Sequence, residues 1–123
     1  MSHSRALADG LAELVGQVSG PDTSVVPAGG APDGSLGTDP DAIAAAVRRA
    51  DRGDGVVVLV DIGSAVLSLR ALYEDGELDE ARVVLADAPL VEGAVAAAVT
   101  ASVGGDLAAV VAAAEEARGA RKL

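Results

Sequence analysis

Apolar and polar positions follow two patterns along the chain, which predict helices and short strands in turn. Leucine and valine recur at helical spacing from Ser4 to about Val18, and Gly20-Pro21 ends that pattern. By contrast, Val56 to Val60 is an unbroken apolar run, typical of a strand buried on both faces. The same criteria predict strands over residues 23–28 and 81–86 and helices over residues 38–52, 64–74, 90–103 and 106–118.

This alternation predicts an open, mostly parallel α/β sheet with helices on both faces. A chain of 123 residues has the length of one domain, so we expect a single domain over residues 1–123. A sheet of this type normally begins with a strand, whereas the first helix here begins almost at Met1. We therefore expect either a three-stranded sheet or a first strand that precedes Ser2 and is missing from this chain.

Composition limits the partners more than it limits the fold. The formal charge is −10 and the isoelectric point is about 4.3, which argues against nucleic acid and against an anionic membrane surface. No cysteine is present, and no apolar run has the length of a membrane span or the form of a signal peptide, so we expect a cytoplasmic protein. Tyr73 is the only aromatic residue, so the core must consist of small aliphatic side chains.

Polar, glycine-rich segments follow each predicted strand. In parallel α/β sheets such segments meet at the carboxyl edge, where ligands bind. Residues 29–39 follow the first predicted strand, Asp61-Ile-Gly-Ser64 follows the second, and Asp87-Ala-Pro89 follows the third. If a strand precedes Ser2, the segment Ser2-His3-Ser4 lies at the same edge, and four strand-to-helix turns come together there.

His3 is the only histidine in the chain and precedes the first predicted helix. The unpaired N–H groups at a helix start favour an anion, so a neutral imidazole there could attack phosphorus and carry a phosphoryl group. Hydrogen-bond donors for the phosphate would come from the turns on either side, with an aspartate fixing the imidazole tautomer. The candidate donors are Gly37, Thr38, Gly63 and Ser64, and the candidate carboxylates are Asp61 and Asp87.

Each of these features also has an ordinary structural interpretation. A histidine near a chain end is more often a surface residue, and Asp61, Ser64 and Asp87 are common helix-capping residues. The sequence has no Walker-type or Gly-x-Gly-x-x-Gly motif, no cluster of metal-ligating side chains and no Gly-x-Ser-x-Gly elbow. We therefore expect no cofactor and no metal, and a Ser-His-Asp hydrolase has no support.

Four segments, taken together and in order, resemble one family. They are Ser2-His-Ser-Arg-Ala-Leu-Ala8, Gly29-Gly30 through to Gly37-Thr38, Val58-Leu-Val-Asp-Ile-Gly-Ser-Ala65 and Ala88-Pro-Leu-Val-Glu-Gly-Ala94. The chain resembles the DhaM family, the phosphotransfer subunits of phosphoenolpyruvate-dependent dihydroxyacetone kinase. That family is related to the IIA domains of mannose-type sugar phosphotransferase systems.

The resemblance implies that His3 is the phosphoryl acceptor. Phospho-HPr, itself phosphorylated by enzyme I, would be the donor, and ADP on the DhaL subunit would be the next acceptor, so that ATP formed there phosphorylates dihydroxyacetone on DhaK. Members of the family are homodimers. The residues expected around the phosphate are Ser2, Ser4, Gly37, Thr38, Asp61, Gly63 and Ser64, with Asp87 and Pro89 as further candidates.

One departure from the family concerns the start of the chain. Relatives carry an apolar strand of about five residues before Ser-His-Ser, and here only Met1 precedes it. We expect that the true start codon lies upstream or that the chain is truncated. Two alternative functions stay open: a mannose-type IIA component that donates to a IIB sugar domain, and a non-catalytic dimeric α/β regulator.

Overall fold

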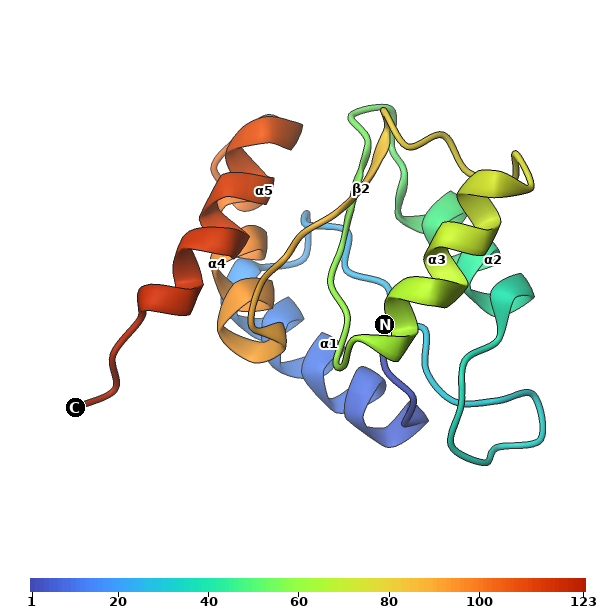
Figure 1. The fold of residues 1–123 in the computed structure, drawn as a ribbon. Helices are drawn as coiled ribbons and strands as arrows, with labels where there is room; N and C mark the ends of the chain where they lie inside the picture. Colours follow the sequence, from blue (N-terminus) through green and yellow to red (C-terminus); the bar gives the residue numbers. More distant parts are fainter.

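Five α-helices surround a small parallel sheet (Figure 1). The structure is a computed structural model that describes all residues from Met1 to Leu123. The elements are α1 (Arg5–Ser19), α2 (Pro40–Ala50), β1 (Val56–Val58), α3 (Ser64–Glu74), β2 (Val83–Leu85), α4 (Leu90–Ser102), α5 (Leu107–Glu116) and the 3₁₀ helix η1 (Ala117–Gly119). No helix is both long enough and apolar enough to cross a lipid bilayer.

β1 and β2 form the sheet, with Val56 opposite Val83 and Val58 opposite Leu85 in parallel register. Helices α2 and α3 lie to one side of it, and α4 and α5 lie to the other, with α1 packed against α4 (Figure 1). The predicted parallel α/β arrangement with helices on both faces is therefore confirmed, although the sheet has only two strands.

The apolar run at β1 serves two separate cores. Val58 is buried with residues of α2 and α3, and Val56 and Val60 pack against the same cluster. Val57 and Leu59 pack against the second cluster, which α4 and α5 provide. Because successive side chains of a strand point to opposite faces, a strand covered on both sides needs apolar residues at every position.

The predicted strand at residues 23–28 is wrong as a regular strand. The only pairing near it is a single parallel bridge between Ser2 and Gly29. In that bridge the Ser2 N–H donates to the Ala28 carbonyl at 3.0 Å, and the Gly30 N–H donates to the Ser2 carbonyl at 3.2 Å. The segment lacks a strand to pair with, because Met1 and Ser2 reach only its carboxyl end.

Helices α1, α2 and α5 each begin directly after a residue whose side chain caps the helix. Ser4 accepts the Leu7 N–H at 3.2 Å, and Asp106 accepts the Ala109 N–H at 2.9 Å. Asp39 caps α2 in the same way, with Pro40 in the first turn. The ends are less well predicted, since α2 ends at Ala50 and α5 gives way to the η1 turn after Glu116.

Gly29 allows α1 to lie close to the bridge. A Cβ atom at Gly29 would lie 2.6 Å from the Ser4 carbonyl oxygen and 2.8 Å from the Ala8 Cβ. We expect Gly29→Ala to lower the free energy of unfolding by about 2–3 kcal/mol, because the start of α1 must move. Urea unfolding measures this. The matched control is Gly10→Ala, where a Cβ meets no atom within 4 Å; this change in mid-helix should add about 0.5–1 kcal/mol. Equal effects of the two changes would contradict the close approach.

The amino group of Met1 lies inside the molecule, where it donates to the Leu59 carbonyl at 2.6 Å. Burial lowers the pKa of this amino group below its ordinary value of 8.0, and the charge of Asp61 opposes the shift only in part. Between the lowered pKa and 8.0 the unfolded chain therefore binds more protons than the folded chain.

We accordingly expect the free energy of unfolding to rise with pH through that window and to level off above it. Urea unfolding at a series of pH values from about 6 to about 9 measures the slope. The Nα-acetylated chain is the control, because its amide keeps the N–H donor but has no proton to lose. An identical slope in the acetylated chain would rule out the amino group as its source.

Candidate functional site

His3 lies between the Ser2–Gly29 bridge and the first turn of α1. Its carbonyl accepts the Gly37 N–H at 2.9 Å, and its own N–H donates to Asp61 Oδ2 at 2.9 Å. The next residue, Ser4, is the N-cap of α1. The backbone of His3 is therefore held by the loop before α2, by the turn after β1 and by α1.

The carboxylate of Asp61 accepts hydrogen bonds from both chain segments that meet here. Oδ2 accepts from the His3 N–H and from the Ser2 hydroxyl at 3.0 Å, and Oδ1 accepts from the Ile62 N–H at 2.8 Å. The His3 Nδ1 lies 3.0 Å from Oδ1. Burial alone would raise the pKa of Asp61, but these hydrogen bonds outweigh it and lower the pKa from 3.8 to about 2. Asp61 is therefore ionised at neutral pH.

An ionised carboxylate can only accept hydrogen bonds, so it fixes the imidazole tautomer. The proton of neutral His3 must lie on Nδ1, where it is donated to Asp61, and the lone pair must lie on Nε2. The Ser64 hydroxyl lies 3.0 Å from Nε2 and donates to it in this tautomer. A quarter of the His3 side chain is exposed, which leaves Nε2 accessible to a reactant.

The start of α3 provides hydrogen-bond donors beside Nε2. Gly63 is the N-cap and Ser64 the first residue of this helix, and no side chain caps it. The N–H groups of Ala65 and Val66 bond to the carbonyls of Ile62 and Gly63, whereas those of Gly63 and Ser64 donate to no protein acceptor. A helix start of this kind favours an anion, and the hydroxyl of Ser64 adds a further donor.

Ser2 and Thr38 have different roles in the site: Ser2 contacts Asp61, and Thr38 contacts α3. Ser2 is almost fully buried, and its hydroxyl donates to Asp61 while accepting the Ser4 N–H at 3.0 Å. The Thr38 hydroxyl bonds to the Ser68 hydroxyl at 2.6 Å, which joins the loop before α2 to α3. Ser2 thus orients the carboxylate that orients His3, while Thr38 makes no hydrogen bond to the imidazole.

The third predicted turn does not contact His3. The side chain of Asp87 is almost fully exposed and pairs with Arg118 at 3.1 Å, while its N–H donates to Glu115 Oε1. Pro89 is the N-cap of α4 and has no side-chain hydrogen bond. Of the two carboxylates that the sequence offered, the structure brings only Asp61 to the imidazole.

Comparison with known proteins places the chain in a family. The family model EIIA-man, described as "PTS system fructose IIA component", matches residues 1–111. The chain belongs to the EIIA-man family.

The curated proteins that are similar to this EIIA-man chain include DhaM subunits of dihydroxyacetone kinases. The chain is 39% identical over 101 residues to PEP-dependent dihydroxyacetone kinase 2, phosphoryl donor subunit DhaM, of Listeria innocua, with 80% of each chain covered. It is 38% identical to the DhaM subunit of Escherichia coli, covering 87% of this chain but 24% of that longer protein. A solved structure, titled as the unknown function protein EF1359, superposes with a TM-score of 0.84 at 38% identity and covers 99% of this chain and 93% of that one.

Sequence analysis missed two contributors to this EIIA-man site. One is the Ile62 N–H, a backbone donor that no residue pattern reveals. The other is Ser68, which lies four residues after Ser64 and therefore on the same side of α3, a spacing that could have drawn attention to it. The structure contains no group of three or more His, Asp or Glu side chains arranged to hold a metal ion.

Proposed function

We propose that the chain is a phosphohistidine carrier that acts as the DhaM component of a dihydroxyacetone kinase. In this role it accepts a phosphoryl group from phospho-HPr on His3 and passes it to ADP on DhaL, and the ATP formed there phosphorylates dihydroxyacetone on DhaK. The observation that carries the proposal is the contact series Asp61–His3–Ser64, which leaves a lone pair on an accessible Nε2. The names of the relatives support the choice of kinase system.

In the first transfer, the Nε2 lone pair of His3 attacks the phosphorus of the donor phosphohistidine. An N–P bond forms on His3, the donor's N–P bond breaks, and the donor imidazole keeps that electron pair. The imidazole of His3 gains positive charge as the bond forms, and the adjacent Asp61 carboxylate stabilises this charge without taking the Nδ1 proton.

The start of α3 stabilises the transferred group. When Nε2 carries phosphorus, the Ser64 hydroxyl loses its acceptor and donates to a phosphoryl oxygen instead. The unpaired N–H groups of Gly63 and Ser64 supply two more donors at the same helix start. The exposed quarter of His3 is where the donor and the acceptor approach in turn.

In the second transfer, a terminal β-phosphate oxygen of ADP attacks the phosphorus on His3. An O–P bond forms, the N–P bond breaks, and the electron pair returns to Nε2. His3 is then neutral again, with its proton still on Nδ1 beside Asp61.

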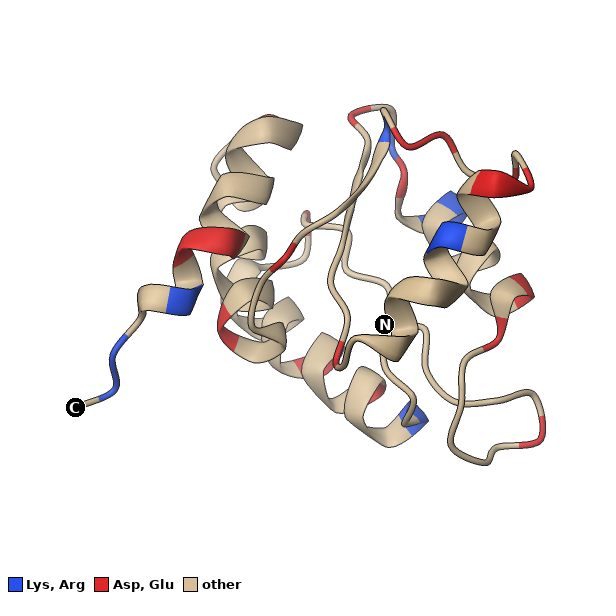
Figure 2. Cartoon of the chain, in the orientation of Figure 1, with Lys and Arg blue, Asp and Glu red and all other residues tan.

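The proposed partners are HPr and DhaL directly, and enzyme I and DhaK indirectly, in the cytoplasm where ADP and phosphoenolpyruvate are available. We also propose a homodimer. Its support is α4, where Glu92 is the only charged residue and Val91, Val99 and the capping Val103 are exposed. Figure 2 shows acidic residues gathered mainly on loops and helix ends, with most of α4 and α5 uncharged.

A second candidate function has one observation in its favour. The matching family is described as a fructose IIA component, which fits donation to a IIB sugar domain. The first transfer would be identical, and only the acceptor would differ.

The test is reconstitution of the relay from purified components. Enzyme I, HPr and labelled phosphoenolpyruvate should transfer label to this chain, and the bond should be labile in acid and stable in base. Addition of DhaL–ADP, DhaK and dihydroxyacetone should then move the label to dihydroxyacetone phosphate. Transfer to a IIB domain but not to DhaL–ADP would favour the second candidate, and no labelling at all would overturn both.

A further inference from the structure

The hydroxyl of Ser64 completes a series of three polar side chains in the site. Asp61 Oδ1 lies 3.0 Å from the His3 Nδ1, and Nε2 of the same imidazole lies 3.0 Å from the Ser64 Oγ. Carboxylate, imidazole and hydroxyl in this order are the arrangement that activates a serine oxygen in hydrolases, and it is recognised by geometry rather than by chain order. The lack of a Gly-x-Ser-x-Gly motif therefore does not exclude a nucleophilic serine here.

The hydrogen bonds run in the direction that an activated serine needs. Because ionised Asp61 accepts the Nδ1 proton of neutral His3, Nε2 has a lone pair and the Ser64 hydroxyl donates to it. Nε2 is therefore placed to take the hydroxyl proton when Oγ attacks a substrate. The neighbouring hydroxyls of Ser2 and Ser68 bond to other side chains and not to the imidazole.

The surroundings of Ser64 suit a small uncharged ester. Ser64 is exposed, and the apolar side chains of Ile62 and Leu67 are each more than half exposed. Leu67 follows Ser64 by three residues on α3 and therefore lies on the same side of the helix. The unpaired N–H groups of Gly63 and Ser64 are available to the negative charge that develops on a carbonyl oxygen. The formal charge of −10 disfavours anionic esters.

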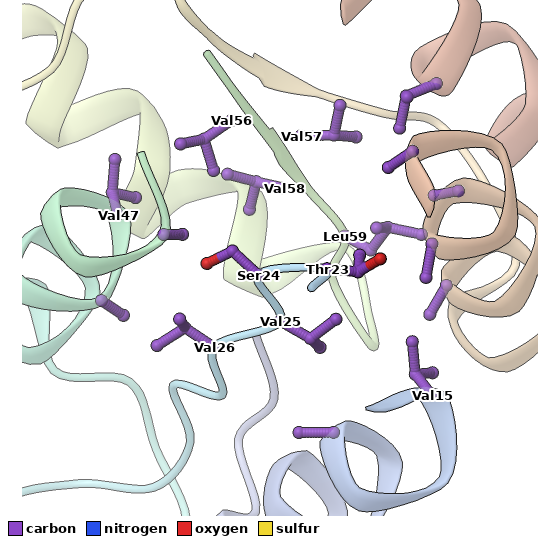
Figure 3. Close-up of a pocket in the computed structure, with 18 of the residues that line it drawn as sticks. Val15, Thr23, Ser24, Val25, Val26, Val47, Val56, Val57, Val58 and Leu59 are labelled. Carbon is purple, nitrogen blue, oxygen red and sulfur yellow. The ribbon is translucent and has the colours of Figure 1, made fainter. Parts of the chain in front are cut away.

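The reacting atoms lie outside the cavity beside β1. That cavity has a volume of about 590 Å³ and lies between β1 and residues 23–28, where Val25 and Val57 are among the apolar side chains that line it (Figure 3). Neither His3 nor Ser64 lines it. An ester therefore meets Ser64 at the open surface, so we expect weak binding and a rate that rises linearly with ester concentration.

We propose that Ser64 is a nucleophile toward neutral, activated carboxylic esters, with His3 as its general base and Asp61 as the residue that positions the imidazole. The Ser64 Oγ attacks the carbonyl carbon while its proton moves to the His3 Nε2. The ester C–O bond then breaks, and the leaving oxygen keeps the electron pair and takes the proton from Nε2. The acyl group stays on Ser64. This activity goes beyond the proposed phosphoryl relay and does not depend on it, because the nucleophile is an oxygen and the atom attacked is carbon.

Water completes the cycle. Its oxygen attacks the acyl carbon while one of its protons moves to Nε2, the bond between that carbon and the Ser64 Oγ breaks, and Oγ takes the proton back from Nε2. A carboxylic acid is released and the site returns to its starting state. A neutral phosphorofluoridate ester traps the same nucleophile, because Oγ forms a bond to phosphorus, fluoride leaves with its electron pair, and the phosphate triester on Ser64 is stable.

The experiment uses para-nitrophenyl acetate as the ester and diisopropyl phosphorofluoridate as the trap. Absorbance measures the release of para-nitrophenolate, and peptide mass spectrometry locates the trapped residue. The proteins are the unchanged chain, Ser64→Ala, Asp61→Asn and Ser102→Ala, with circular dichroism as the check that each one is folded. Ser102 is the matched control, because it is an exposed serine at the end of α4 whose hydroxyl donates to the Val99 carbonyl.

We expect the trap to modify Ser64, and para-nitrophenolate release to fall at least about tenfold in Ser64→Ala and in Asp61→Asn but not in Ser102→Ala. Trapping only at other residues would overturn the proposal. Release by Ser64→Ala at the rate of the unchanged chain would also overturn it, because His3 would then be the nucleophile. Labelling of the same Ser64→Ala protein from phospho-HPr separates the two activities, since this variant keeps the phosphoryl acceptor.

Discussion

Replacement of His3 by alanine is expected to abolish phosphoryl transfer through this chain, with a loss of at least about 10⁴-fold in rate. The reason is that no other side chain in the site can take over the role. The chain has no other histidine and no cysteine, and in the variant the Ser64 hydroxyl loses the imidazole that it contacts. The measurement is the rate of labelling from phospho-HPr.

Two further measurements separate chemistry from folding. Free imidazole added to the His3→Ala variant should restore part of the flux, because it can occupy the space between Asp61 and Ser64. Ser64→Ala, which keeps the nucleophile and removes one hydroxyl donor, should slow transfer by only about tenfold. Label retained on the folded His3→Ala protein would mean that another residue is the acceptor.

Asp61→Asn is expected to slow transfer by about 10²–10⁴-fold while leaving the nucleophile in place. The carboxylate accepts four hydrogen bonds here, from Ser2, from Ile62 and twice from His3. An asparagine has one acceptor oxygen and an NH₂ group that donates, so it cannot hold the Nδ1 proton as firmly and favours a lone pair on the wrong ring nitrogen.

The same substitution should change how the free energy of unfolding depends on pH in the acid range. The pKa of Asp61 is lowered to about 2 in the folded chain, so its contribution is fully present above the unfolded value and is lost as the pH falls from about 4 to about 2. A shift of this size corresponds to about 2 kcal/mol at neutral pH. Urea unfolding across this range should show a shallower pH dependence for Asp61→Asn than for the unchanged chain.

Asp87→Asn is the matched control for both measurements. Asp87 was the other carboxylate that the sequence offered, and its side chain is almost fully exposed beside Arg118. We expect its loss to leave the transfer rate, and the pH dependence of the free energy of unfolding in acid, nearly unchanged. If Asp87→Asn slowed transfer as much as Asp61→Asn, the conclusion that Asp61 fixes the tautomer of His3 would be contradicted.

The parts of the fold that depend on local chemistry could be predicted from the sequence. The bounds of α3 agree with the prediction, because the polar turn before Ser64 and the Asp75-Gly76 turn after Glu74 mark both ends. The apolar run at β1 correctly indicated a strand covered on both faces. The proximity of residues 2–4 and 61–64 followed from the rule that parallel strands share a carboxyl edge.

The remaining features depend on pairing and distance, which no local pattern contains. Residues 23–28 have the composition of a strand, but residues 24–27 make no backbone hydrogen bond, and only Ala28 bonds to another extended segment, at Ser2. Asp61 and Asp87 each follow a strand, but the register that sets Val58 opposite Leu85 makes Asp87 level with Val60, one residue before Asp61. Only Asp61 meets the imidazole. The Thr38–Ser68 hydrogen bond joins residues 30 positions apart.

The position of the Met1 nitrogen makes the two ends of the polypeptide unequal as attachment points. The last residues beyond η1 are exposed and their backbone extends away from the helices (Figure 1), with Lys122 paired to Glu92 of α4, so a purification tag or a fluorophore there should disturb at most that surface ion pair. Anything fused at the other end has to leave from beside Leu59, two residues before His3. A leader sequence chosen only for convenience would therefore become part of the interior.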